Sequence, residues 1–124
     1  MKTIRKSKVT EKNELLRKKI EKYIKENTKQ ASLDELSVLL GYSSVYTGKL
    51  VKTLTGSTFK KLLQSARLGI AARMLRSPNK KIGEIIFECG YENESFFRRI
   101  FKKEFGMTPL NYRRENCRRR NVKK

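Results

Sequence analysis

The chain has 124 residues, enough for one domain with a modest core, and 31 lysines and arginines against 12 aspartates and glutamates give it a formal net charge of +19. Self-repulsion at this charge favours an anionic partner, such as DNA, RNA, an anionic lipid surface or an acidic protein. Histidine is absent, which excludes imidazole-based acid–base catalysis, nucleophile pairs and metal sites.

The N-terminal part predicts one helix after a basic segment. Residues 1–9 are mostly polar and basic, and we expect them to be disordered. From Thr10 onward, apolar side chains recur at the spacing of one helical face: Leu16, Ile20, Tyr23 and Ile24.

Two shorter helices follow. The segment Ser32-Leu33-Asp34-Glu35 is a capping-box pattern, which predicts a helix with a buried face of Leu33, Leu36 and Leu40. A third helix, about 44–55 and capped by Ser43 or Ser44, places on one face Tyr46, Leu50 and Leu54. A glycine is expected to end each helix, at Gly41 and Gly56.

The second half predicts four more helices. The longest runs from 58 to 77, where Ser77-Pro78 breaks it, and its inward face is expected to hold Phe59, Leu62, Leu63, Ala66, Ile70 and Met74. A short helix spans Ile82 to Cys89, and Asn93 caps the next. Pro109, at a first-turn position, begins a short last helix. No segment alternates like a strand, so the predicted fold is all-α with seven helices.

The chain also repeats itself. Leu33, Gly41 and Tyr42 match residues 49 positions later, namely Ile82, Gly90 and Tyr91. At an offset of 50, Tyr46, Leu50, Lys52, Gly56 and Thr58 match Phe96, Ile100, Lys102, Gly106 and Thr108. Each copy therefore reads as a short helix, a Gly-Tyr turn and a longer helix with a basic outer face.

That order of elements is typical of a helix-turn-helix unit, whose second helix enters the DNA major groove. An ordinary αα-hairpin is the alternative for a single copy. Two copies in a chain of charge +19 favour duplex DNA as the partner. The recognition helices are then about 44–55 and 94–105.

The helix between the two copies is about as long as the distance between successive major-groove faces of B-DNA. Residues 58–77 span about 30 Å at ~1.5 Å per residue, and major-groove faces on one side of B-DNA lie ~34–36 Å apart. We therefore predict that one chain places its two recognition helices in adjacent major-groove segments. The expected organisation is a first subdomain with the linker helix (10–76), a second subdomain (77–115) and a basic tail (116–124).

At these residues the chain resembles the AraC/XylS family of bacterial transcription regulators. The second copy carries the sharpest motifs: Ile82-Gly83-Glu84-Ile85, Gly90-Tyr91, Ser95-Phe96-Phe97-Arg98-Arg99, Phe101-Lys102-Lys103, Gly106-Met107-Thr108-Pro109 and Tyr112-Arg113. The resemblance covers about residues 12 to 115. It implies a seven-helix fold, activation of transcription by contact with RNA polymerase, and often a separate sensor domain. No sensor domain is expected in this chain, which reads as a single-domain member of the MarA/SoxS type or as a fragment of a longer regulator.

The resemblance also assigns roles in the second recognition helix. Glu94, Ser95, Arg98 and Arg99 stand where the family reads bases and touches adjacent phosphates. Arginine pairs with guanine, glutamate accepts from cytosine and serine does either. A solvated basic face is the alternative, whereas the spacing of the phenylalanines indicates core packing rather than base stacking.

In the first copy the matching base-reading positions are Ser44, Val45, Gly48 and Lys49. This copy departs from the family, with Thr47-Gly48 in place of leucine and a polar residue, and Val51 in place of phenylalanine. Val45 can touch a thymine methyl and Gly48 can admit the backbone close to DNA, but the unit can equally bind mainly phosphates. Phosphate contacts are expected from Ser43, Lys52, Arg73, Asn93, Lys102 and Lys103.

Three other classes of function are less consistent with the sequence. A basic RNA-binding protein shares the charge but does not explain the repeat. A membrane-surface protein exposes an apolar face, and no apolar run reaches the ~18 residues of a span. No catalytic constellation, metal site or cofactor motif is present, so we expect neither an enzyme nor a cofactor. Cys89 is expected buried and Cys117 solvent-facing, in a bacterial cytoplasmic protein.

Overall fold

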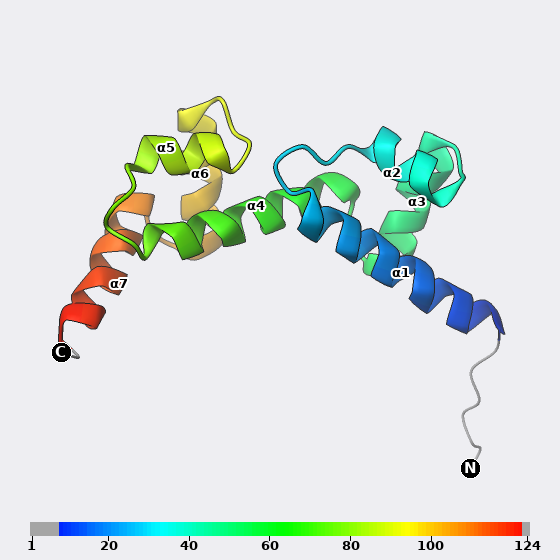
Figure 1. The fold of residues 1–124 in the computed structure, drawn as a ribbon, viewed down its shortest axis with the longest axis horizontal. Helices are drawn as coiled ribbons and strands as arrows, with labels where there is room; N and C mark the ends of the chain where they lie inside the picture. The colour runs from blue at the N-terminus through cyan, green and yellow to red at the C-terminus, as the bar shows by residue number, and fades with distance from the viewer. Residues whose placement is uncertain (1–7, 123–124) are drawn as a thin grey trace, which may run out of the picture. The chain divides into compact units, whose positions relative to one another are not determined.

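The computed structural model describes the backbone of residues 8–122 and the side chains of residues 10–117. This part of the chain contains seven helices and no strand, as the sequence predicts (Figure 1). The helices are α1 Lys8–Glu26, α2 Leu33–Leu40, α3 Ser44–Thr55, α4 Phe59–Leu75, α5 Ile82–Glu88, α6 Glu94–Phe105 and α7 Pro109–Val122. Helix α1 begins two residues before Thr10, and the predicted disorder of residues 1–7 falls outside the described residues.

The helices form two compact units, residues 1–64 and 65–124, which divide inside α4. The first unit holds α1, α2, α3 and the start of α4, and the second holds the rest of α4 with α5, α6 and α7. The sequence predicts that the linker helix, through residue 76, belongs to the first subdomain. In the structure, the α4 side chains beyond Ser65 pack in the second unit.

In the first unit, α1, α2 and α3 contact one another. The buried apolar side chains are Ile20, Tyr23, Ile24, Leu36, Val51 and Leu63. The predicted inward face of α3 is wrong by about one position, because Thr47 and Val51 are fully buried while Tyr46 is 49% exposed. The Tyr46 ring instead meets the ring of Tyr42 edge-on, with centroids 4.9 Å apart. The tyrosine is therefore apolar enough to resemble a core residue but packs outside the core.

The predicted capping box at α2 forms only in part. The Ser32 hydroxyl accepts from the Glu35 amide at 3.1 Å, as expected. The Glu35 carboxylate does not reach back to Ser32 but accepts from the Tyr23 hydroxyl of α1, which itself accepts from the Ser32 amide at 2.9 Å. Burial, assisted by this bond to Glu35, raises the pKa of Tyr23. A residue from another helix has thus replaced half of a local motif.

The second unit has a larger and more aromatic core. Helix α4 contributes Leu68, Ala71, Ala72 and Leu75. Helix α5 and its C-cap contribute Ile85, Ile86 and Cys89, and α6 contributes Phe97 and Phe101. The face predicted for α4 is only partly right, since Ile70 and Met74 pack against this core without being fully buried, and Leu63 is buried in the first unit. One helix serves two cores, so a single apolar stripe along its length does not describe both.

The end of the second unit is fastened by Arg113 of α7. Its Nε donates to the carbonyl of Leu75 at 3.1 Å and its terminal nitrogen donates to the carbonyl of Ser77 at 2.9 Å, which satisfies carbonyls at the end of α4. Helix α7 continues to Val122 and is longer than expected, so most of the segment predicted as a tail is helical.

Cys89 is buried as predicted, whereas Cys117 is half-buried rather than solvent-facing. Cys89 is 2% exposed, and burial raises the pKa of its thiol to about 11, so the thiol stays protonated near neutral pH. Cys117 is half-buried, with its sulfur 3.5 Å from the Arg76 carbonyl. Neither residue forms a disulfide.

Candidate nucleic-acid interface

Helix α6 presents one apolar face inward and one polar face outward. Phe97 and Phe101 are fully buried, which fixes the helix against the second core. The positions on the opposite side are exposed, and they are the four residues that the sequence assigned to base reading: Glu94, Ser95, Arg98 and Arg99. The Asn93 side chain caps the helix by accepting from the Phe96 amide at 2.9 Å.

Both arginines of this face have partners on the same helix. A terminal nitrogen of Arg98 lies 3.5 Å from Glu94 Oε1 one turn earlier, and the Arg99 guanidinium lies 5.7 Å from the ring centroid of Phe96. These contacts are solvent-exposed and therefore weak, so an incoming base or phosphate can compete with them. Both guanidinium groups therefore lie along α6 and stay exposed to solvent.

The turn before α6 contacts a residue to which the sequence assigned no role. The Arg67 guanidinium of α4 lies 5.5 Å from the ring centroid of Tyr91. Burial raises the pKa of Tyr91, while Arg67 acts in the opposite direction. The Tyr91 ring also meets the rings of Phe96 and Phe97. Arg67 lies about two turns into α4, and the sequence spacing carries no signal that connects it with this turn.

Helix α3 offers a different outer face. Val45 is 71% exposed, Lys49 and Lys52 are exposed, and Gly48 is half-buried. Ser43 caps the helix by accepting from the Tyr46 amide at 3.1 Å, which settles the choice between Ser43 and Ser44. The Ser44 hydroxyl donates to Asp34 Oδ1 of α2 at 2.5 Å, so this predicted base-reading group is already engaged in joining two helices.

The fold does not require glycine at position 48. A β-carbon there would lie 3.5 Å from Leu33 Cδ2, which is an ordinary van der Waals contact. The backbone is also free of the left-handed conformation that glycine relieves elsewhere in the chain. Packing within the first unit therefore gives no reason for this residue.

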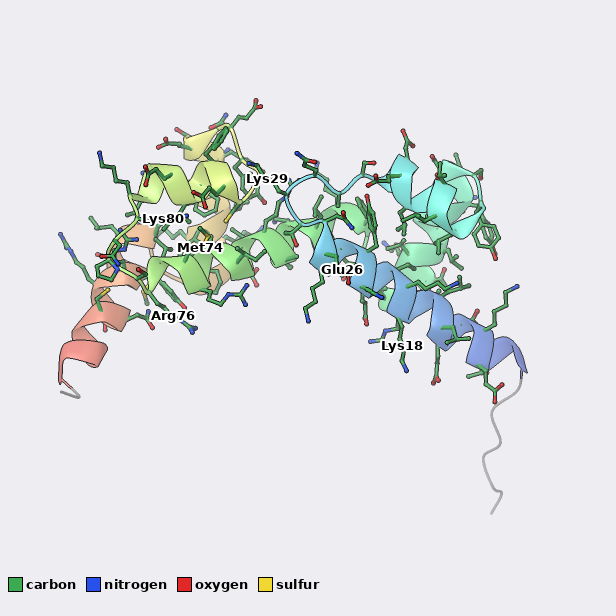
Figure 2. All side chains as sticks on the ribbon, viewed as in Figure 1. Lys18, Glu26, Lys29, Met74, Arg76 and Lys80 are labelled. Carbon is green, nitrogen blue, oxygen red and sulfur yellow. The ribbon has the colours of Figure 1, made fainter. Side chains whose placement is uncertain are left out.

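The remaining predicted phosphate contacts lie on exposed positions. Lys102 and Lys103 are exposed in the last turns of α6, and Arg73 is exposed near the end of α4. Nitrogen-tipped side chains project from helices of both units (Figure 2). Among the described residues there is no cluster of side chains suited to a metal ion, and no helix there is long and apolar enough to cross a membrane.

The sequence is similar to known helix-turn-helix proteins. A family model described as a helix-turn-helix domain matches residues 36–115. The regulatory protein SoxS of Salmonella typhimurium is 33% identical over 82 residues, which cover 66% of this chain and 77% of SoxS. The chain belongs to the AraC/XylS family. It is therefore a DNA-binding transcription regulator of that family, as the sequence motifs predict.

Solved structures agree on the fold. The C-terminal domain of AraT, a response regulator from Geobacillus stearothermophilus, is 30% identical with a TM-score of 0.67, covering 88% of each chain. The DNA-binding domain of AdpA, solved with a target DNA, has a TM-score of 0.74 over 86% of this chain and 96% of its own, but at 23% identity it supports the fold alone. The alternative of a basic RNA-binding protein gains no support from these relatives.

Proposed function

We propose that this AraC/XylS-family regulator recognises a bipartite duplex site, with α6 reading bases and α3 contributing mainly phosphate contacts. The observation that carries the proposal is the exposed face of α6, where two arginines, a glutamate and a serine stand opposite the buried Phe97 and Phe101. Because the inward face is packed firmly, the helix backbone is held in place and its outward side chains project from fixed positions, as base recognition requires.

The side chains of α6 suit base edges in the major groove. Arg98 and Arg99 each carry the fork geometry that pairs with guanine N7 and O6. Glu94 can accept from the amino group of cytosine, and Ser95 can donate or accept. Their contacts within α6 are exposed and weak, so exchanging them for contacts with DNA costs little.

Helix α3 is less suited to base reading. The Ser44 hydroxyl is engaged by Asp34, Gly48 offers no side chain, and Val45 offers only apolar contact with a thymine methyl. Lys49 and Lys52 add exposed positive charge, which attracts phosphates without distinguishing bases. We therefore assign to the first unit a smaller share of the sequence preference.

Phosphates are held at the capped helix starts and by exposed cations. Ser43 and Asn93 mark the N-termini of α3 and α6, where backbone amides favour an anion, and Lys52, Arg73, Lys102 and Lys103 supply charge. If 6–10 phosphates are contacted, affinity falls about 10³- to 10⁵-fold between about 50 and 200 mM salt. A flat salt titration contradicts this assignment.

We further propose that binding activates transcription through contact with RNA polymerase, as the family resemblance implies. In a purified transcription reaction with a promoter that carries the selected site, the protein is expected to raise transcript yield. A fall in yield indicates repression. A separate sensor domain is a further partner that the family resemblance implies.

The test of DNA recognition is selection of bound duplexes from a random pool at ~150 mM salt, followed by sequencing. Two enriched blocks about one helical turn apart, one sharper than the other, are expected for adjacent major-groove segments. A single block reduces α3 to a phosphate clamp. No enrichment contradicts base reading and returns RNA and other anionic partners to consideration.

A further inference from the structure

The two units place different residues at the same junction, where the supporting helix meets the first turn of the recognition helix. In the first unit, Asp34 of α2 accepts a hydrogen bond from Ser44 of α3. The repeat-equivalent residues of the second unit, at offsets of 49 and 50, are Gly83 of α5 and Glu94 of α6. The carboxylate therefore lies on the supporting helix in the first unit and on the recognition helix in the second. The supporting helix of the second unit has no side chain at this position.

The carboxylate of Glu94 lies close to the bare backbone of Gly83. A β-carbon added at Gly83 would stand 3.3 Å from Glu94 Oε2, which is tighter than an ordinary van der Waals contact. The other oxygen, Oε1, lies 3.5 Å from the Arg98 guanidinium. Glu94 is therefore fitted between a residue without a side chain and an arginine on the exposed face of α6.

Backbone conformation does not explain this glycine. Gly83 lies in the first turn of α5 and is not among the glycines with positive φ. A helical glycine is less stable than alanine, so the position gives up helix stability without any conformational need. The neighbouring atom that an added β-carbon would meet within 4 Å is Glu94 Oε2, so the missing side chain leaves space for that carboxylate.

We infer that Gly83 is a specificity-determining positioning residue, because its missing side chain lets the Glu94 carboxylate stay beside Arg98 on the base-reading face of α6. This inference rests on the proposed base reading by α6. Gly83 touches no base itself. It acts by leaving the Glu94 side chain without a hydrogen bond to α5. In the first unit, by contrast, a hydrogen bond between Ser44 and Asp34 joins the two helices at the equivalent junction.

Two substitutions change this junction in defined ways. Gly83→Ala adds only the β-carbon and displaces Oε2 by a few tenths of an ångström. Gly83→Ser adds a hydroxyl that can donate to Glu94, which reproduces the bond of the first unit with donor and acceptor exchanged between the helices. Both remove a helical glycine, so neither is expected to lower the melting temperature.

The experiment compares the 124-residue chain with Gly83→Ser, Gly83→Ala, Glu94→Ala and the double variant Gly83→Ser with Glu94→Ala. Each is used in selection from the random duplex pool and in a melting measurement. The matched control is Gly69→Ala, since Gly69 is a helical glycine of the second unit with no atom within 4 Å of an added β-carbon. This control is expected to raise the melting temperature without altering base preference.

Gly83→Ser is expected to relax the preference at one base pair by about 5-fold, the lower range for one base contact. Glu94→Ala relaxes the same base pair, and the double variant shows no further loss. Gly83→Ala shifts preference at that base pair in the same direction but less. Retained melting temperature with altered preference is an outcome that a purely structural role for Gly83 does not produce.

Three results overturn the inference and separate its failure from that of the proposed function. If Glu94→Ala relaxes one base pair while Gly83→Ser and Gly83→Ala keep the wild-type preference, Gly83 has no positioning role and base reading stands. If Glu94→Ala changes nothing but the wild type still enriches a sharp block, other residues read it. If the wild type enriches no block, base reading and the inference fail together. Should Gly83→Ser not fold, Gly83→Ala decides between these outcomes.

Discussion

The recognition helices of the two units have equivalent positions but unequal cores. Where the first unit buries Thr47 and Val51, the second buries Phe97 and Phe101. The Thr47 hydroxyl is fully buried with no hydrogen-bond partner among the described residues. The two phenylalanine rings stack with centroids 5.7 Å apart, and Phe101 also meets the ring of Tyr112. The two copies thus share the side-chain caps of their recognition helices and their left-handed glycines, while their packing differs.

This difference parallels the assignment of roles. The better-packed helix, α6, carries the charged face proposed to read bases, and the less well-packed α3 carries Gly48 and an engaged Ser44. Base discrimination needs side chains held in place, whereas phosphate attraction tolerates looser geometry. Uneven packing is therefore compatible with a division into one reading unit and one clamping unit.

The largest effect is expected from truncation at the equivalent core positions. Phe97→Ala is expected to lower the free energy of unfolding by about 3–5 kcal/mol, because it leaves a cavity among aromatic side chains. Thr47→Ala removes a methyl and an unpaired hydroxyl, so we expect a loss of about 1 kcal/mol or less. Urea denaturation followed by resonances from each unit measures both. Equal losses contradict the inequality of the two cores.

The next largest effect is expected on DNA binding, at Arg99 and its repeat-equivalent residue Lys49. Arg99→Ala is expected to relax the preference at one base pair by about 1–3 kcal/mol, because a forked contact with a base is lost. Lys49→Ala is expected to weaken binding to all duplexes alike, since a lysine on α3 contributes charge rather than readout. Competition between selected and random duplexes distinguishes the two. Uniform weakening by Arg99→Ala removes its base-reading role.

Removing the unpaired hydroxyl of Thr47 is expected to stabilise the first unit, which is the opposite of the effect of truncating its core. Thr47→Val keeps the shape of the side chain and replaces a buried polar atom with a methyl, so we expect a gain of about 1–2 kcal/mol in the free energy of unfolding. The matched control is Thr28→Val, because the buried Thr28 hydroxyl donates to the Ile24 carbonyl at 2.8 Å and its loss is expected to destabilise. A loss of stability in Thr47→Val indicates that the hydroxyl has a partner after all.

The smallest effect is expected at Gly48. Gly48→Ala meets only an ordinary contact with Leu33 and removes a glycine from a helix interior, so stability is expected to rise by about 0.5–1 kcal/mol. If α3 acts mainly through lysines, affinity for the selected duplex changes less than in Arg99→Ala. A large loss of affinity with raised stability instead indicates that the α3 backbone approaches DNA at this residue, which a binding titration beside a melting curve will detect.

The sequence predicted the features that depend on neighbouring residues. The caps at Ser43 and Asn93 are present, and so are the left-handed glycines that end α2, α3 and α6. Each of these signals depends on hydrogen bonds or backbone angles within about four residues, so no distant element is needed to read it. The repeat, the family and the exposed face of α6 followed from the same local patterns.

Only the tertiary structure decided which side of a helix is buried and what a polar side chain pairs with. Contacts with other helices decide three features that the sequence did not predict. They are the burial of Thr47 on α3, the packing of α4 against a second core, and the hydrogen bond between Tyr23 and Glu35. The same holds for the junctions of Asp34 with Ser44 and of Gly83 with Glu94. Helical periodicity specifies that one face is apolar, but the partner that covers it selects the rotation and the contacts, and that partner comes from elsewhere in the chain.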